Sequence, residues 1–236
     1  MSVLASLVER FAALLEPLFH ASAAAAAIIL LTALVRLLVH PLSRASARGQ
    51  KARKALQPKI AELNKKHGKD PERLQKAVLE LHAKEQVSPL AGCLPSLIQL
   101  PVFFILFHLF SRPTIGGEPN GLLEHELLAA PLGKRWTDAL GGGGGLFGPA
   151  GLVYLGLFAL VAVVAWFGYR QGRRTLSASV PAAPGSEVPG LGAVTRVMPY
   201  LSFFTLVSVA VVPLAAALYI VTSTAWGTAE RALLHR

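Results

Sequence analysis

The sequence predicts an all-α membrane protein with five transmembrane helices. Of the 236 residues, 53% are hydrophobic and only 15% are charged, whereas about a quarter of the residues in a soluble domain are charged. The shortage of charge is concentrated in long apolar runs, which is the pattern of membrane spans. The net charge of +10 lies mostly between these runs, as expected for loops that fix topology and attract lipid.

Residues 1–18 predict an amphipathic helix. Glu9, Arg10 and Glu16 fall away from an apolar stripe with three- and four-residue spacing. The stripe comprises Val3, Leu4, Leu7, Val8, Phe11, Leu14, Leu15 and Leu18. We expect this helix to lie in the membrane interface.

The first span is predicted at 21–42, and its one charged residue is Arg36. The chain then becomes polar and basic over 43–88. Two triplets of apolar residues recur there with the i, i+4, i+7 spacing of a helix. They are Leu56, Ile60, Leu63 and Leu74, Val78, Leu81. We therefore expect an antiparallel helical hairpin that stands outside the membrane.

The predicted turn of the hairpin lies at 67–71. Gly68 suits a helix C-cap, Asp70 an N-cap and Pro71 the first position of the next helix. Pro58 is expected to break or start the first arm.

The middle of the chain predicts two further spans. The second span is expected at 89–110, followed by an external Gly-rich loop at 111–148 with a short interfacial segment near 121–130. The third span is expected at 149–169 and a disordered cytoplasmic loop at 170–196.

The last apolar run, 197–229, has 33 residues. It is much longer than one span of about 20 residues and short for two. Pro213 near its middle favours two short spans, at 197–212 and 213–229, with a cytoplasmic tail at 230–236.

The distribution of Lys and Arg decides the topology. The segment 43–88 carries twelve, 111–148 only three and 170–196 four. Because basic loops stay in the cytoplasm, the first and third of these segments are predicted to be cytoplasmic. Arg231 and Arg236 join them only if the last run crosses twice, so the N-terminus is predicted outside and the C-terminus inside.

Arg36 is the candidate functional residue. An arginine at the centre of a span costs about 2.5–3.5 kcal/mol and usually faces a wet cavity. Thr32, one turn away, favours such a cavity, whereas snorkelling to the headgroups is the alternative. No Asp or Glu lies within a predicted span, so Arg36 is expected to have no internal ion-pair partner and to attract an outside anion.

Other polar residues in the predicted spans could share that cavity. They are Gln99 in the second span and Tyr219, Thr222 and Ser223 on one face of the fifth. The alternative is that they only join helices through hydrogen bonds.

Nothing in the sequence predicts catalysis, a metal or a cofactor. The seven histidines show no ligand spacing, Cys93 is the only cysteine, and no phosphate-binding loop is found. The basic segment 43–88 lacks aromatic residues for base stacking, so no DNA partner is expected. It could contact anionic lipid or ribosomal RNA, or be merely solvated.

Three stretches resemble the YidC family of membrane insertases. They are TALVRLLVHPL at 32–42, LQP at 56–58 and SPLAGCLPSLIQLPVF at 88–103. The region from Pro213 to Ser223, with Leu218, Tyr219 and Ile220, resembles the family's fifth span. The resemblance is dense over 28–110 and weaker over 194–230.

The resemblance implies five spans around a hydrophilic groove that opens to the cytoplasm and to lipid. The arginine matched by Arg36 would attract acidic residues of the incoming chain, and the hairpin would receive it. The implied partners are nascent membrane proteins, the bilayer, the ribosome and the Sec translocon, in a bacterial cell membrane and without nucleotide hydrolysis.

Several departures imply a Gram-positive, actinobacterial type of member. We expect no extra N-terminal span, no large periplasmic domain and no long basic tail, and Thr224 stands where Asn is common. The competing functions are a small-molecule or anion transporter that uses Arg36, disfavoured by the lack of inverted repeats, and a structural scaffold.

Overall fold

The computed structural model describes residues 2–68, 70–87, 94–141, 145–177 and 200–234 of the chain. It is an all-α protein with two very small β-ribbons. The helices are α1 (Ser2–Phe19), η1 (His20–Ser22), α2 (Ala23–His67), α3 (Pro71–Lys84), α4 (Leu94–Ser111), η2 (Gly121–Leu123), α5 (Trp136–Gly141), η3 (Gly145–Phe147), α6 (Pro149–Ser177), α8 (Leu201–Val211) and α9 (Leu214–Leu234).

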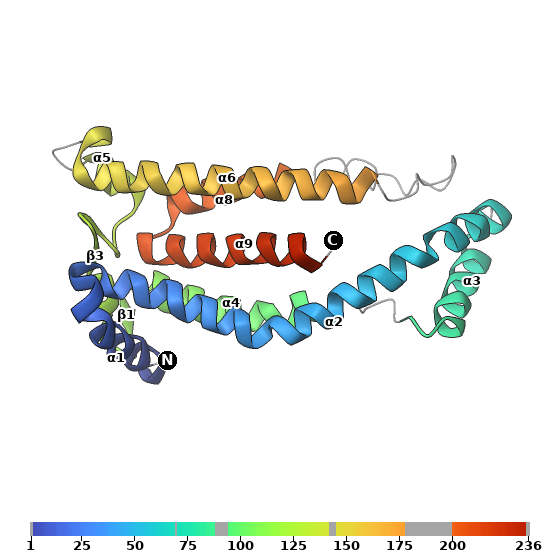
Figure 1. Ribbon diagram of the computed structural model, residues 1–236, viewed down its shortest axis with the longest axis horizontal. Helices are drawn as coiled ribbons and strands as arrows, with labels where there is room; N and C mark the ends of the chain where they lie inside the picture. Colours follow the sequence, from blue (N-terminus) through green and yellow to red (C-terminus); the bar gives the residue numbers. More distant parts are fainter. Residues whose placement is uncertain (1, 69, 88–93, 142–144, 178–199, 235–236) are drawn as a thin grey trace.

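Helix α9 lies at the centre of the bundle. In Figure 1 it runs between α6 and α8 on one side and α2 and α4 on the other, and it packs against all four. Every residue from Leu214 to Tyr219 is buried. Three of these residues are alanines, whose small side chains let neighbouring helices approach closely.

Helix α2 is one continuous helix of 45 residues that contains Pro41 and Pro58. The prediction that Pro58 breaks or starts the first arm is therefore wrong. Both prolines are exposed. Pro58 lies in the part of α2 that is predicted to stand outside the membrane, so the backbone carbonyl that it leaves without a helical donor can bond to water there. Figure 1 shows that α2 bends part-way along its length, as prolines inside helices cause.

The far part of α2 packs against α3. The predicted cap positions are confirmed: Gly68 is the C-cap of α2, and Pro71 is the first residue of α3. The Asp70 side chain at the N-cap of α3 accepts from the Arg73 backbone N–H at 3.1 Å. Lys59 Nζ donates to Glu85 Oε1 at 2.5 Å and ties the two helices together near the other end of α3.

The segment after α4 is more structured than the predicted Gly-rich loop. It forms the antiparallel ribbons β1–β2 and β3–β4. Their strands are Thr114–Ile115, Glu118–Pro119, Glu126–Leu127 and Ala130–Pro131. Leu122, Ala130 and Leu132 are buried in the same core as the adjoining helix ends. The segment folds back because these apolar side chains leave water.

Asn120 fixes this segment to α4. Its buried Nδ2 donates to the carbonyl oxygens of Leu109 at 2.8 Å and Arg112 at 3.0 Å. These are carbonyls near the C-terminal end of a helix, which lack intrahelical partners. The asparagine therefore closes that end of α4.

The last apolar run breaks at Pro213 into α8 and α9, as predicted. However, α9 continues past 229 to Leu234, so Glu230 belongs to the helix and not to a tail. Helix α6 likewise continues beyond 169 to Ser177. The remainder of the predicted loop, 178–196, and the start of the second predicted span, 89–93, lie outside the described residues.

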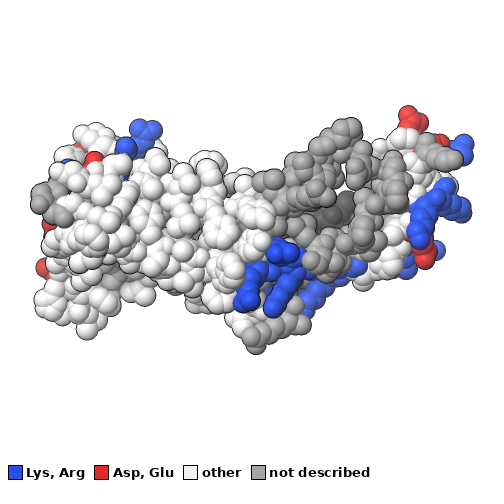
Figure 2. All heavy atoms as spheres, turned by 90° about the horizontal axis from the view of Figure 1, so that it is seen from above, with Lys and Arg blue, Asp and Glu red and all other residues white. Residues whose placement is uncertain are grey.

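Two described helical segments, Ser6–His67 and Pro149–Arg174, are long and apolar enough to cross a membrane, and Leu100–Ser111 and Leu201–Val211 are shorter apolar helices. Figure 2 shows a broad part of the surface without charged side chains, with Lys and Arg beyond it. The exposed apolar residues of α6 include Leu160, Val163 and Phe167. The number of crossings stays a prediction.

Candidate functional site

Arg36 reaches from α2 to α9. Its side chain is half-buried, and its Nε and Nη2 donate to Ser223 Oγ at 3.2 and 2.5 Å. Gly227 lies one turn further along α9, where an added Cβ would stand 4.0 Å from Arg36 Nη1. The guanidinium therefore lies along the Ser223–Gly227 face of the central helix.

Tyr219 lies one turn before Ser223 and is 1% exposed. Its ring packs against Phe103 and Phe110 of α4, with centroids 5.7 and 5.9 Å away. Its hydroxyl lies close to Ser223, but no well-aligned hydrogen bond joins it to another described residue. The Tyr219 hydroxyl is therefore buried beside Ser223, the residue that Arg36 contacts.

The other predicted residues differ in their placement. Thr32 is buried, and its Oγ1 donates to the Ile28 carbonyl of its own helix at 2.6 Å. Thr222 is half-buried on α9. Gln99 lies in α4, but its side chain is outside the described part of the structure. The described structure thus brings together Arg36, Tyr219 and Ser223.

A second contact joins the same two helices one turn further along. His40 Nδ1 meets Glu230 Oε1 in a close ion pair or hydrogen bond. Glu230 is 9% exposed and also interacts electrostatically with Arg36 and with Arg231. Neither member of this pair is among the residues that the sequence predicts for the site. Helical spacing could have found them, because His40 follows Arg36 by four residues and Glu230 follows Ser223 by seven.

One carboxylate, that of Glu230, thus comes close enough to Arg36 to interact with it electrostatically, although the sequence predicts no Asp or Glu within a span. Glu230 is inside the bundle because α9 runs further than the apolar run suggested. Nevertheless, in the described ranges the ion pairs within 4.0 Å include none between Arg36 and a carboxylate. The acceptor that Arg36 contacts is a neutral hydroxyl.

The opposite end of α9 is closed by backbone contacts. The first N–H groups of the helix, those of Leu214 and Ala215, donate to the carbonyls of Lys134 and Leu132, each at 2.9 Å. Tyr154 of α6 donates from its hydroxyl to the same Lys134 carbonyl at 2.6 Å. The segment after β4 thereby covers the start of the central helix.

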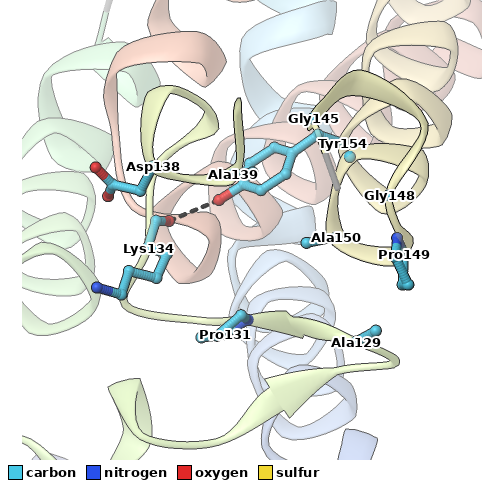
Figure 3. A pocket seen from close by; sticks show the side chains of 11 residues that line it. Ala129, Pro131, Lys134, Asp138, Ala139, Gly145, Gly148, Pro149, Ala150 and Tyr154 are labelled. Carbon is cyan, nitrogen blue, oxygen red and sulfur yellow. Dashed lines mark hydrogen bonds between the residues drawn. The ribbon is translucent and has the colours of Figure 1, made fainter. Parts of the chain in front are cut away.

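A cavity of about 510 Å³ lies at this closed end. Figure 3 shows it between the segment around Lys134 and Asp138, the start of α6 and Tyr154. Its lining comes from around the start of α6, whereas Arg36 contacts α9 between Ser223 and Gly227. The cavity and the arginine are therefore separate features.

The sequence matches the family described as "60Kd inner membrane protein" over residues 15–236. It is similar to proteins named "Membrane protein insertase YidC". That of Magnetococcus marinus is 51% identical over 81 residues, covering 34% of this chain and 15% of the relative. That of Clostridium perfringens is 42% identical over 87 residues, covering 37% of each. That of Polynucleobacter asymbioticus is 41% identical over 101 residues, covering 42% of this chain and 18% of the relative.

The matched segments thus span well under two thirds of these relatives, while the family match extends over nearly the whole of this chain. This confirms the resemblance that the motifs at 32–42 and 88–103 indicated. The chain belongs to the 60Kd inner membrane protein family, the family of the YidC membrane insertases.

Proposed function

We propose that this protein guides transmembrane segments of nascent membrane proteins into the bilayer through a hydrophilic groove around Arg36. The groove opens towards the cytoplasm and laterally to lipid. The reaction needs no nucleotide, because the substrate's apolar segment leaves the groove for lipid and this burial drives the step. Protein substrates and the bilayer are the partners, and the ribosome and Sec translocon can deliver substrates.

The observation that carries this proposal is the half-buried cation of Arg36 with a hydroxyl as its close partner. An arginine in a span is costly, and contact with Ser223 offsets only part of that cost. A substrate carboxylate at about 4 Å would add about 4 kcal/mol of attraction before desolvation, at an effective dielectric constant of 20. Arg36 therefore suits a passing anionic side chain.

The two ends of α9 support a groove with one open end. At its start, Leu214 and Ala215 are covered by backbone contacts, and Tyr219 is buried. The charged residues Arg36, Glu230 and Arg231 lie together towards its other end. A polar segment that enters from this side has less than the full 30 Å of hydrocarbon left to cross.

Site-specific crosslinking tests the proposal. A photoreactive residue at position 222, beside the Tyr219 and Ser223 contacts, should crosslink a ribosome-bound single-span protein during insertion. Position 147 in η3, where Phe147 is 78% exposed, is the matched control and should give no adduct. Equal adducts at both positions would contradict a groove around Arg36.

Ion flux separates insertion from transport. Proteoliposomes containing the protein should insert a single-span substrate and should not conduct small anions. Anion flux that depends on Arg36, without insertion, would favour the transporter.

A further inference from the structure

Two rungs of polar contacts connect α2 with α9 on the side of Arg36. Arg36 contacts Ser223 on the first rung, and His40 contacts Glu230 on the second. Residues four apart on a helix share a face, so His40 follows Arg36 on α2. Gly227, against which the guanidinium lies, separates Ser223 from Glu230 on α9.

The second rung contains a carboxylate in a cationic surrounding. Glu230 is 9% exposed, and its close partner His40 has a side chain that is 33% exposed. Arg36 and Arg231 both interact electrostatically with Glu230. A buried carboxylate is costly unless it is paired, so these surrounding groups stabilise its charge. Conversely, its charge neutralises part of theirs.

We propose that Glu230 is an internal competitor for substrate carboxylates and sets how acidic a translocated segment must be to engage Arg36. This inference rests on the proposed function. A carboxylate that arrives at Arg36 meets the negative charge of Glu230 as well as the positive charge of the guanidinium. Segments with too few acidic residues are therefore held too weakly.

His40 has a positioning role in this proposal. Its contact holds Glu230 on the second rung, and in the described part of the chain no carboxylate pairs with Arg36 within 4.0 Å. Without His40, the Glu230 carboxylate is released towards the neighbouring arginine. The competitor then becomes stronger.

Substitutions of Glu230 and of His40 should consequently change the insertion of weakly acidic substrates in opposite directions. Glu230→Gln keeps the shape and the contact with His40 but removes the negative charge, so weakly acidic substrates should insert about three- to tenfold better. His40→Gln keeps the carboxylate and releases it, so the same substrates should insert less well. A purely structural tie between α2 and α9 would instead make both variants change in the same direction.

The experiment measures insertion by the full-length protein in proteoliposomes. The substrates are one single-span protein whose translocated segment carries zero, one, two or three Asp residues, with Asn replacements as neutral controls. The readout is the protease-protected fraction against the number of Asp residues. Glu230→Asp, which restores the charge, should return the wild-type dependence, and thermal unfolding in detergent reports on folding.

The outcomes separate this inference from the proposed function. If Arg36→Ala removes the dependence on Asp while Glu230→Gln leaves it unchanged, the groove stands and the competitor is wrong. If Arg36→Ala leaves insertion of acidic substrates intact, the proposed function itself fails. Equal losses in Glu230→Gln and His40→Gln, with lowered thermal stability in both, would show that the pair only holds the helices together.

Discussion

At the residue scale, the positive charge of Arg36 and the negative charge of Glu230 have different close partners. Arg36 bonds to the hydroxyl of Ser223, while Glu230 bonds to His40 one turn away. A direct ion pair between Arg36 and Glu230 would neutralise both charges and would leave Arg36 no free charge for a substrate carboxylate. The observed arrangement keeps the arginine available at the cost of a buried carboxylate next to it.

Replacing Arg36 tests whether this availability is used. Arg36→Ala should still fold, because it loses hydrogen bonds to one hydroxyl, worth about 1 kcal/mol, and His40 still pairs with the buried Glu230. Insertion of substrates with acidic translocated segments should fall about tenfold or more. Arg36→Lys keeps a compact, strongly hydrated charge and should retain part of the activity. A protease-protection assay measures both.

Ser223→Ala is the matched control for Arg36→Ala. It removes the acceptor of Arg36 and leaves the positive charge in place, so acidic substrates should still insert. A loss as large as that of Arg36→Ala would mean that the contact between α2 and α9, and not the charge, is what insertion requires.

Asn120 allows a second prediction, about stability. Asn120→Ala leaves the carbonyls of Leu109 and Arg112 without their side-chain donor. Unsatisfied buried groups cost about 1–3 kcal/mol, so the melting temperature in detergent should fall. Glu118→Gln, on the same segment but exposed, should leave the melting temperature unchanged, and an equal fall there would contradict the role of Asn120.

The sequence alone was sufficient to single out Arg36 and Ser223 as polar groups within apolar runs. It could not place Glu230, because this residue lies directly after the end of the apolar run 197–229. A helix ends where capping and tertiary contacts end it, not where hydropathy falls. Glu230 is tolerated inside α9 because His40 of another helix pairs with it, and that contact spans 190 positions of the chain.

At the scale of elements, the arm formed by the far part of α2 and α3 is held partly by charge. The pKa of Glu85 lies below its ordinary value of 4.5, first because Lys59 donates a hydrogen bond to the carboxylate and also because Lys59 is positively charged. The charged form of Glu85 is thus favoured when the helices are together. Its stabilisation is present above the ordinary pKa and is lost as the pH falls through the lowered value.

Acidification should therefore loosen the arm. Spin labels at the exposed positions 62 of α2 and 80 of α3 should report a broader distance distribution at a pH well below the ordinary pKa of 4.5 than at pH 7. The change should be modest, because both partners of the pair are solvent-accessible. Glu85→Gln should show the broader distribution already at pH 7 and little further change, whereas an unchanged acid response in that variant would exclude Glu85 as its cause.

The elements differ in how far the sequence predicted them. The turn at Gly68–Pro71 was predictable, because capping is local chemistry. The ribbons after α4 were not, because their order depends on Leu122 and Leu132 packing against helices distant in the sequence. The sequence also could not show that α2 continues through Pro58. A proline on a solvent-exposed face can bend a long helix without ending it.

At the scale of the whole molecule, the predicted topology can be tested by labelling cysteines from either side of the membrane. With Cys93 replaced by Ser, single cysteines placed in 111–148 should react with an impermeant reagent on intact cells. Cysteines in 43–88 and 170–192 should react only after permeabilisation, because the basic segments are expected inside. Labelling of 43–88 from outside would contradict the topology and the direction of the proposed groove.

The central position of α9 could not be predicted from its own sequence. Its apolar run resembles any other span, yet the five-residue stretch from Leu214 to Leu218 is buried throughout while neighbouring α8 exposes Phe204, Val207 and Val211. Its alanines do not distinguish it, because α2 also has a mostly buried run of alanines at 23–27. What places α9 at the centre is its fit against four neighbouring helices. Such fitting depends on all partners at once, so hydropathy alone does not show it.

The continuity of α2 has a mechanical consequence. A helix of 45 residues measures roughly 68 Å along its bent axis, and the same helix holds the contact with α3 and the guanidinium of Arg36. A force applied to α3 and the far part of α2 is therefore transmitted along one continuous helix and not through a flexible linker. The two prolines act as joints, since each lacks one backbone hydrogen bond. Pushing the arm sideways therefore bends α2 first at Pro58 and Pro41, and Pro41 lies next to His40.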